Sequence, residues 1–127
     1  MKLLLDTNAL IWWFEDNRKL GPRARRRLAD PRTIPIATIV SLWEMTMKFR
    51  VGKLKQPGSA LLSVLAEQQI ELIGVRAEHL RALDALAMHH GDPFDHLILA
   101  QAKAEGATLM TSDDAMRAYG VPCIDTD

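Results

Sequence analysis

The chain has one cysteine, no net charge and no long hydrophobic run. The single cysteine, Cys123, excludes a scaffold built on disulfides. No apolar stretch approaches the roughly 18 residues that a membrane span requires. The apolar run at residues 3–5 is too short for a signal peptide and ends at Asp6. We therefore expect a protein that does not enter a membrane and that resides in the reducing cytoplasm.

A strong charge imbalance, which disordered chains usually show, is also missing. Hydrophobic residues make up 48% of the 127 positions, and the formal net charge is zero. That composition argues against disorder, and the length is typical of one folded unit. We expect a single domain over residues 1–127.

The neutral total hides a segregation of charge. Residues 18–55 contain eleven lysines and arginines but only two acids, Asp30 and Glu44, so this segment carries +9 and the remainder −9. Such polarity is compatible with a polyanionic partner, and equally with solvated helix faces.

Short apolar runs alternate with longer helical patterns along the chain. The expected strands cover residues 2–5, 34–36, 70–75, 107–110 and 121–124. The expected helices cover residues 7–16, 23–29, a start at Thr38 or Ser41 through 50, 59–68, 77–89, 93–105 and 114–119. Pro35 weakens the second strand because it has no N–H to donate. Alternating strands and helices predict a parallel sheet covered on both faces.

Four acids stand where such a sheet would place a ligand. Asp6 and Asp113 follow two of the expected strands, whose carboxyl ends meet at one edge. Glu44 and Asp95 lie near helix starts between large apolar residues. Carboxylates gathered in one site must take up protons or bind a cation, and an all-oxygen set suits Mg²⁺ or Mn²⁺. The corresponding chemistry is phosphodiester hydrolysis by a metal-activated water.

Each acid also has a structural interpretation. Asp6 and Thr7 can cap the first helix. Glu44 stands three residues after Ser41, as in a capping box, and four before Lys48, as in a helix ion pair.

The other two acids are also placed as helix caps would be. Asp95 stands three residues after Asp92, which we expect to cap the helix beginning at residue 93, and Asp113 directly precedes an expected helix. Taken singly, the structural interpretation is the stronger one for every acid; only their joint placement favours a site.

The ordered set of motifs resembles the PIN-domain ribonucleases, and the VapC toxins of prokaryotic toxin–antitoxin pairs most of all. The segments that carry the resemblance span nearly the whole chain: LLLDTNALIW at 3–12, SLWE at 41–44, GKL at 52–54, DPFD at 92–95, LAQA at 99–102 and TSD at 111–113.

The resemblance implies a three-layer α/β/α sandwich with a central, mainly parallel sheet. It also implies an endoribonuclease that depends on Mg²⁺ or Mn²⁺ and forms a homodimer inhibited by a small antitoxin. The positions matching the family's metal-binding and catalytic acids are Asp6, Glu44, Asp95 and Asp113. The supporting polar positions are Thr7, Asn8 and Thr111.

Two positions depart from close relatives, which often have His in place of Asn8 and Arg in place of His96. The second departure puts a phosphate or carboxylate contact in doubt without removing a metal ligand. The candidate contacts to substrate or partner are Trp12, Arg25, Arg26 and His96.

Two other functions would also use acids or basic residues in these positions. A phospho-aspartate protein, either a receiver domain or a haloacid-dehalogenase-like phosphatase, needs a second acid close to Asp6, but Thr7 and Asn8 stand there. A non-catalytic module that binds RNA or protein through the basic segment remains the alternative, with the acids acting only as helix caps.

Overall fold

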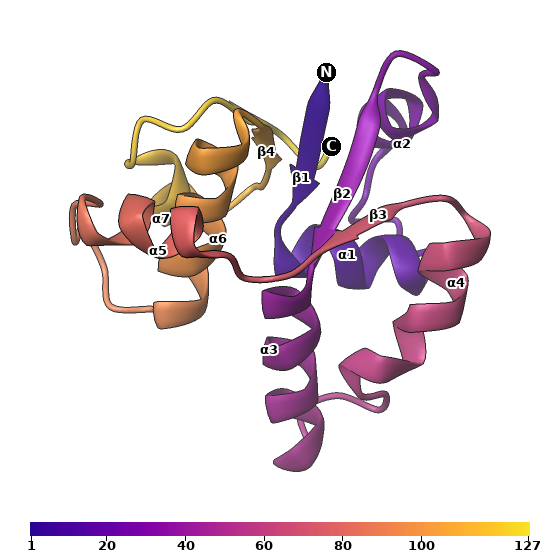
Figure 1. Ribbon diagram of the computed structural model, residues 1–127. Helices are drawn as coiled ribbons and strands as arrows, with labels where there is room; N and C mark the ends of the chain where they lie inside the picture. Colours follow the sequence, from indigo (N-terminus) through magenta and orange to yellow (C-terminus); the bar gives the residue numbers. More distant parts are fainter.

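The computed structural model describes residues 1–127 as one parallel five-stranded sheet with helices on both faces (Figure 1). Its strands, in chain order, are β1 (Lys2–Leu5), β2 (Ile34–Thr38), β3 (Glu71–Ile73), β4 (Thr108–Met110) and β5 (Cys123–Ile124). Their order across the sheet is β3-β2-β1-β4-β5, and every neighbouring pair is parallel. The α/β class and the parallel sheet expected from the sequence are confirmed.

Strand β2 is longer than predicted and includes Pro35. The proline lies opposite Leu3 of β1, whereas pairing with β3 begins only at Ile36. Pro35 thus has a strand neighbour on one side only, and its missing N–H costs no bond to β3. The same residue that argued against a strand is tolerated at this point of the sheet.

The two faces of the sheet are covered by separate apolar clusters. In β1, Leu3 and Leu5 face one cluster and Leu4 faces the other, and all three are fully buried. This alternation follows from the two-residue period of a strand. A sheet buried on both faces explains why β1 is apolar throughout rather than alternating with polar residues.

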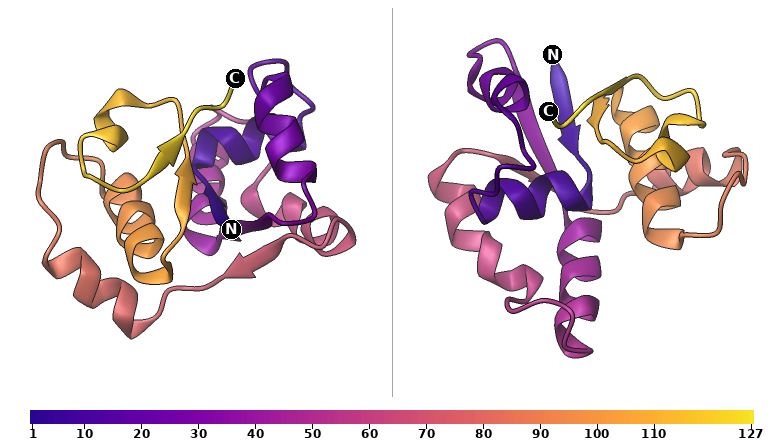
Figure 2. Two further views of the ribbon diagram at one scale, coloured as in Figure 1. Left: turned by 90° about the horizontal axis from the view of Figure 1, so that it is seen from above. Right: turned by 180° about the vertical axis from the view of Figure 1, so that it is seen from behind.

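Helices form the outer layers (Figure 2). The helical elements are α1 (Thr7–Phe14), α2 (Pro22–Ala29), α3 (Ile39–Arg50), η1 (Gly58–Leu61), α4 (Leu62–Glu67), α5 (Ala77–Asp84), α6 (Pro93–Glu105) and α7 (Asp114–Arg117). Figure 1 shows α5, α6 and α7 on one side of the sheet and α1, α2 and α4 on the other. None of these helices has the length and apolar character needed to cross a membrane.

Several helix ends differ from the sequence prediction. Helix α1 stops at Phe14 and α5 at Asp84, so residues 85–92 connect α5 to α6 without regular structure. The cap of α1 is Asp6 rather than Thr7: its carboxylate accepts the N–H of Ala9 at 2.7 Å. An N-cap carboxylate also suits the positive end of the helix dipole.

Helix α3 begins earlier than a Ser41 cap would give. Its cap is Thr38, whose hydroxyl accepts the N–H of Val40 at 3.2 Å. Ser41 and Glu44 are therefore inside the helix, and the predicted capping box between them is wrong. The predicted ion pair between Glu44 and Lys48 is present at 3.1 Å.

A candidate acidic active site

The site is built at the point where the chain changes direction across the sheet. After β1 the chain moves to β2 and β3 on one side, and later returns to β4 and β5 on the other. Leu5 pairs with Met110, and the N–H of Asp6 donates to the carbonyl of Met110 at 3.1 Å. Asp6 and Thr111 thus leave the sheet side by side, at the kind of crevice where open α/β sheets bind ligands.

Asp6 is the most deeply placed acid of the set. Its side chain is buried, and Oδ1 accepts the Ala9 N–H. Burial raises its pKa from 3.8 to about 6, and the nearby charges of Asp95 and Asp113 add to the rise, while hydrogen bonds from Thr111 and Ala9 oppose it. The fold therefore makes ionisation of Asp6 more costly than it is for an aspartate in water.

Asp95 lies in the first turn of α6 and is half-buried. Burial raises its pKa, as do the charges of Asp92, Glu44 and Asp113, while a hydrogen bond with His90 acts in the opposite direction. Asp92 caps α6 by accepting the N–H groups of Phe94 and Asp95. The expectation that Asp92 is a helix cap is confirmed.

Asp113 is the exposed member and caps α7. Its Oδ1 accepts the N–H of Ala115 at 2.9 Å, and its own N–H donates to the hydroxyl of Thr111 at 3.0 Å. The hydroxyl of the buried Thr111 thus accepts the backbone N–H of Asp113, and Thr111 also lies near enough to Asp6 to lower the pKa of that carboxyl group.

Glu44 differs from the aspartates because both of its oxygens have partners. Oε1 accepts the hydroxyl of Thr7 at 2.7 Å, and Oε2 lies 3.1 Å from Nζ of Lys48. The hydroxyl of Thr7 also lies 3.0 Å from that of Ser41. Thr7 is thus placed to orient Glu44.

The four acids consequently act on one another electrostatically, with burial decreasing from Asp6 and Glu44 to Asp113. Asp95 and Asp113 each have one oxygen bonded to the scaffold and one without a partner in the chain. Hard carboxylate oxygens held in fixed directions fit Mg²⁺ or Mn²⁺ better than a softer transition metal. No three of the four, however, have donor atoms that all lie within 4.8 Å of one another.

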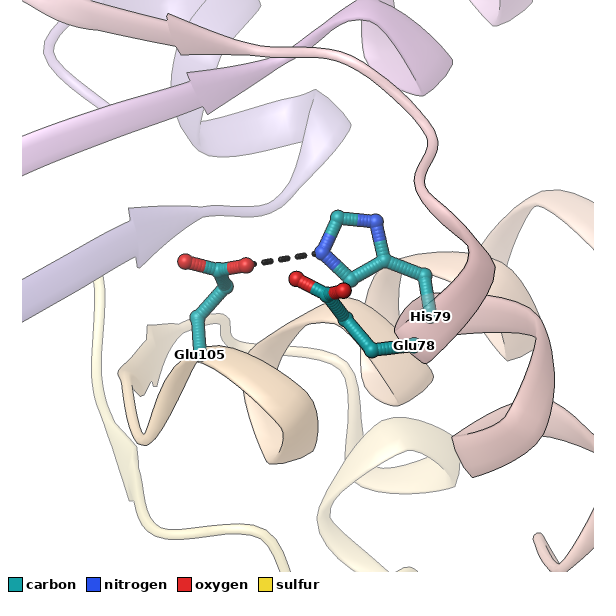
Figure 3. Close-up of side chains that lie close together, drawn as sticks. All are labelled: Glu78, His79 and Glu105. Carbon is teal, nitrogen blue, oxygen red and sulfur yellow. Dashed lines mark hydrogen bonds and ion pairs between the residues drawn. The ribbon is translucent and has the colours of Figure 1, made fainter.

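One other group in the molecule does have that close spacing: Glu78, His79 and Glu105, on α5 and α6 (Figure 3). The Nδ1 atom of the buried His79 accepts the backbone N–H of Arg76 at 3.0 Å, so Nε2 carries the proton of the neutral ring. That Nε2–H points to Glu105 at 2.8 Å. A ring fixed in this tautomer has no lone pair to offer a metal at Nε2.

Glu105 is also paired with two cations, Arg76 at 3.0 Å and Lys2 at 3.6 Å. Its interactions with Arg76 and His79 lower the pKa of its carboxyl group. The cluster therefore fastens α5 to α6 and to the start of β1, and it is not the acidic site predicted from the sequence.

The predicted contact residues lie in different surroundings. Arg26 is exposed, as is Asn8, which was predicted as a supporting residue, whereas Trp12 is half-buried with Nζ of Lys19 5.8 Å from its ring centre. The guanidinium of Arg25 is bonded within the chain, to Asp16 and to the carbonyls of residues 17 and 20. Nε2 of His96 lies 2.6 Å from the carbonyl of residue 90.

Sequence reasoning missed His90. The expected helix 77–89 includes His89, but α5 ends at Asp84, and the structure places His89 and His90 in the loop before α6. Yet Nε2 of His90 lies 3.0 Å from Oδ2 of Asp95. The available signal was the position of His90, five residues before Asp95 and next to the turn that begins α6.

Comparison with known proteins identifies the family. Residues 3–122 match the PIN domain family, and the chain therefore belongs to it. Ribonuclease VapC22 of Mycobacterium tuberculosis is 27% identical over 123 residues, which cover 94% of this chain and 93% of that protein. The resemblance to VapC-type PIN domains that the motifs indicated is confirmed.

Solved structures support the same fold. VapBC2 from Rickettsia felis, bound to a DNA fragment from its promoter, has a TM-score of 0.79 at 18% identity and covers all of both chains. VapBC-1 from nontypeable Haemophilus influenzae has a TM-score of 0.74 at 16% identity, over 99% of this chain and 98% of that one. A toxin–antitoxin complex from Klebsiella pneumoniae has a TM-score of 0.64 at 21% identity, over 98% of each.

Proposed function

We propose that this protein is an endoribonuclease toxin of the VapC type, dependent on Mg²⁺ or Mn²⁺ and inhibited by a cognate antitoxin. The observation that carries the proposal is the state of Asp6. It is buried at the switch point between β1 and β4, and burial together with Asp95 and Asp113 raises its pKa to about 6. A divalent cation would relieve that repulsion and the cost of ionising Asp6.

Asp6, Asp95 and Asp113 would hold the cation, with Glu44 beside them. When bound, Mg²⁺ or Mn²⁺ supplies a Lewis acid that activates water and offsets charge on the phosphate. The scaffold directs the aspartates: the N–H of Ala9 fixes Asp6, His90 fixes Asp95, and the N–H of Ala115 fixes Asp113.

The exposed Asp113 is the acid best placed to meet substrate. Its Oδ2 has no partner in the chain and is therefore free to hold the cation on the open side of the site. Thr7 holds Glu44 in one orientation, and Lys48 places a positive charge 3.1 Å from Oε2. Together these groups would orient water and phosphate on the open side of the site.

RNA would also meet the basic segment, but away from the reacting bond. Arg23, Arg26 and Arg27 are exposed on α2. Figure 1 shows α2 level with the amino-terminal half of β2, whereas β1 ends lower in the view, where α1 begins. Arginines there fit contacts to a distant part of the RNA backbone, with an affinity that falls as salt rises.

An antitoxin would have an apolar surface to bind next to the acids. A groove of about 250 Å³ is lined by Ile39, Leu42, Trp43, Thr46, Ser59 and Leu62. Trp43 is 56% exposed, and its ring packs against Phe94 with centroids 4.8 Å apart. Trp43 and Phe94 precede Glu44 and Asp95 in sequence, so a partner in this groove would lie close to the site.

A homodimer and a cytoplasmic location remain predictions of the sequence.

A cleavage assay tests the proposal. The purified protein is incubated with a fluorescently labelled single-stranded RNA oligonucleotide and with total bacterial RNA, in Mg²⁺, in Mn²⁺ and in EDTA. We expect cleavage only with metal, and a loss of at least about 100-fold in Asp95→Asn and Asp113→Asn, since each removes a proposed ligand. Glu78→Gln, an exposed acid on α5, is the matched control and should cleave like wild type.

Two results would contradict the proposal. Equal cleavage in EDTA would exclude dependence on a divalent ion. RNA binding without cleavage at any metal concentration would identify the non-catalytic module instead.

A further inference from the structure

Loop residues His89 and His90 are held against Tyr119, which follows α7. The tyrosine is buried, and its hydroxyl oxygen lies 2.9 Å from the backbone N of His89 and 3.1 Å from that of His90. It also lies 2.7 Å from Nδ1 of His90 and 3.1 Å from Nε2 of His96. One hydroxyl thus meets four nitrogen atoms.

The positions of the protons follow from what each atom can donate. Nε2 of His96 lies 2.6 Å from the carbonyl oxygen of His90, which can only accept, so this nitrogen carries a proton. It therefore cannot accept the proton of the Tyr119 hydroxyl. The two backbone N–H groups fill the two lone pairs of that hydroxyl oxygen.

The one acceptor left for the hydroxyl proton of Tyr119 is Nδ1 of His90. Accepting it leaves His90 as the neutral tautomer with its proton on Nε2. That N–H donates to Oδ2 of Asp95 at 3.0 Å. A chain of hydrogen bonds therefore runs from Tyr119 through His90 to Asp95.

Asp95 needs such a donor. Asp92, Glu44 and Asp113 are all close enough to act on its charge, and repulsion among them favours turning the carboxylate away. The His90 N–H fixes Oδ2 and leaves Oδ1 without a partner in the chain. Outer-shell partners that orient a ligand in this way typically contribute 10- to 100-fold in metal affinity.

We propose that His90, held in one tautomer by Tyr119, is a positioning residue that orients Asp95 for cation binding. The inference rests on the proposed function for the role of Asp95. The hydrogen-bond chain itself stands on the contacts of Tyr119, His90 and His96.

The first experiment uses the wild-type protein without metal. Long-range proton–nitrogen NMR correlations of the histidine rings report which nitrogen carries the proton. We expect the Nε2–H tautomer for His90, and a mixture of tautomers in Tyr119→Phe. A predominant Nδ1–H tautomer for His90 in wild type would overturn the proposal, whatever the activity of the protein.

The second experiment measures the affinity for Mn²⁺ alone, by calorimetry, in three variants. His90→Leu removes the donor and should weaken binding by about 10- to 100-fold. His90→Gln keeps an N–H at a similar reach and should recover most of the loss. His89→Leu is the matched control. The ring of His89 packs on Tyr119, but it is His90 that bonds Asp95, so the Mn²⁺ affinity of His89→Leu should stay as in wild type.

The outcomes separate the two proposals. Equal Mn²⁺ affinity in wild type and a folded His90→Leu, or no recovery in His90→Gln, would overturn the positioning role. Absence of Mn²⁺ binding by wild type, together with the Nε2–H tautomer, would contradict the proposed nuclease and not the hydrogen-bond chain.

Discussion

Oε2 of Glu44 lies 3.1 Å from Nζ of Lys48, one helical turn later on α3. The carboxylate is buried, whereas the lysine is half-exposed. Glu44 is thus the acid whose charge the protein already offsets with its own cation, whereas the aspartates face one another. This difference divides the four acids into a charge-balanced member and three that gain more from a metal.

Removing the lysine should therefore change both stability and metal affinity. Lys48→Met leaves Glu44 buried without its ion partner, and because the lysine is partly exposed we expect the free energy of unfolding to fall by about 1–2 kcal/mol without metal. One positive charge fewer near the site should tighten Mn²⁺ binding by about three- to tenfold. Arg50→Met, exposed in the last turn of the same helix, is the control. Denaturant melts and Mn²⁺ calorimetry measure the two effects, and unchanged Mn²⁺ affinity in Lys48→Met would refute the second.

Asp6 should make the metal-free protein less stable as pH rises. Its pKa is raised from 3.8 to about 6 in the folded state, so folding is favoured by the protonated form. The stability that this form provides is complete below about pH 4 and is lost as pH rises through 6. A rise of about two pKa units corresponds to about 3 kcal/mol.

Asp6→Asn tests this because asparagine keeps the N-cap acceptor and removes the charge. In EDTA at pH 7.5 the variant should melt several degrees higher than wild type, and the gap should close as pH falls toward 4. A variant that melts lower at every pH would show that Asp6 is chiefly a structural cap.

A divalent cation should stabilise the folded protein through the same acids. Binding to the native state alone raises stability with ligand concentration, by about 2.7 kcal/mol at 100 times the dissociation constant. We expect Mn²⁺ to raise the melting temperature of wild type, EDTA to reverse the rise, and Asp95→Asn to abolish it. Glu105→Gln removes an acid outside the site, so a loss of the Mn²⁺ effect in that variant would place the metal elsewhere.

Glu105 should instead contribute to stability in the pH range where it is ionised. Its pKa is lowered by the interactions with His79 and Arg76, so the stabilisation is present above its ordinary value of 4.5 and is lost as pH falls through the lowered pKa. At pH 7 we expect Glu105→Gln to lose about 1–3 kcal/mol in urea melts. Glu78→Gln removes an exposed partner of Arg76 and should change stability by less than about 0.5 kcal/mol. An equally large loss of stability in Glu78→Gln would contradict the conclusion that Glu105 is the acid that fastens α5 to α6.

The sequence predicts the sheet, and also the edge of the sheet at which the acids lie, because both depend on local patterns. Apolar runs locate β1 and β4, and the acids that follow them, Asp6 and Asp113, come together because the strands are neighbours and parallel. Pro35 wrongly weakened the prediction of β2. Its effect depends on where β3 begins to pair with β2, and that is a tertiary property which the local sequence does not contain.

The partners of the acids are less accessible to sequence reasoning. Thr7 contacts Glu44 across 37 residues, and Tyr119 contacts His90 across 29, so neither pair forms a local pattern. The spacing of Glu44 and Lys48 does form one, and that ion pair was predicted. The half-buried Trp12 and the internally bonded Arg25 show that helical position alone does not determine exposure.

The central place of β1 in the sheet has a consequence for synthesis. Residue 6 is translated well before residues 110–113, which are its neighbours across the crevice. A nascent chain without β4 therefore has an aspartate at residue 6 and no pocket around it. The full set of acids can therefore gather only after residue 113 has emerged and β4 has paired with β1, so any chemistry at this site has to wait until then.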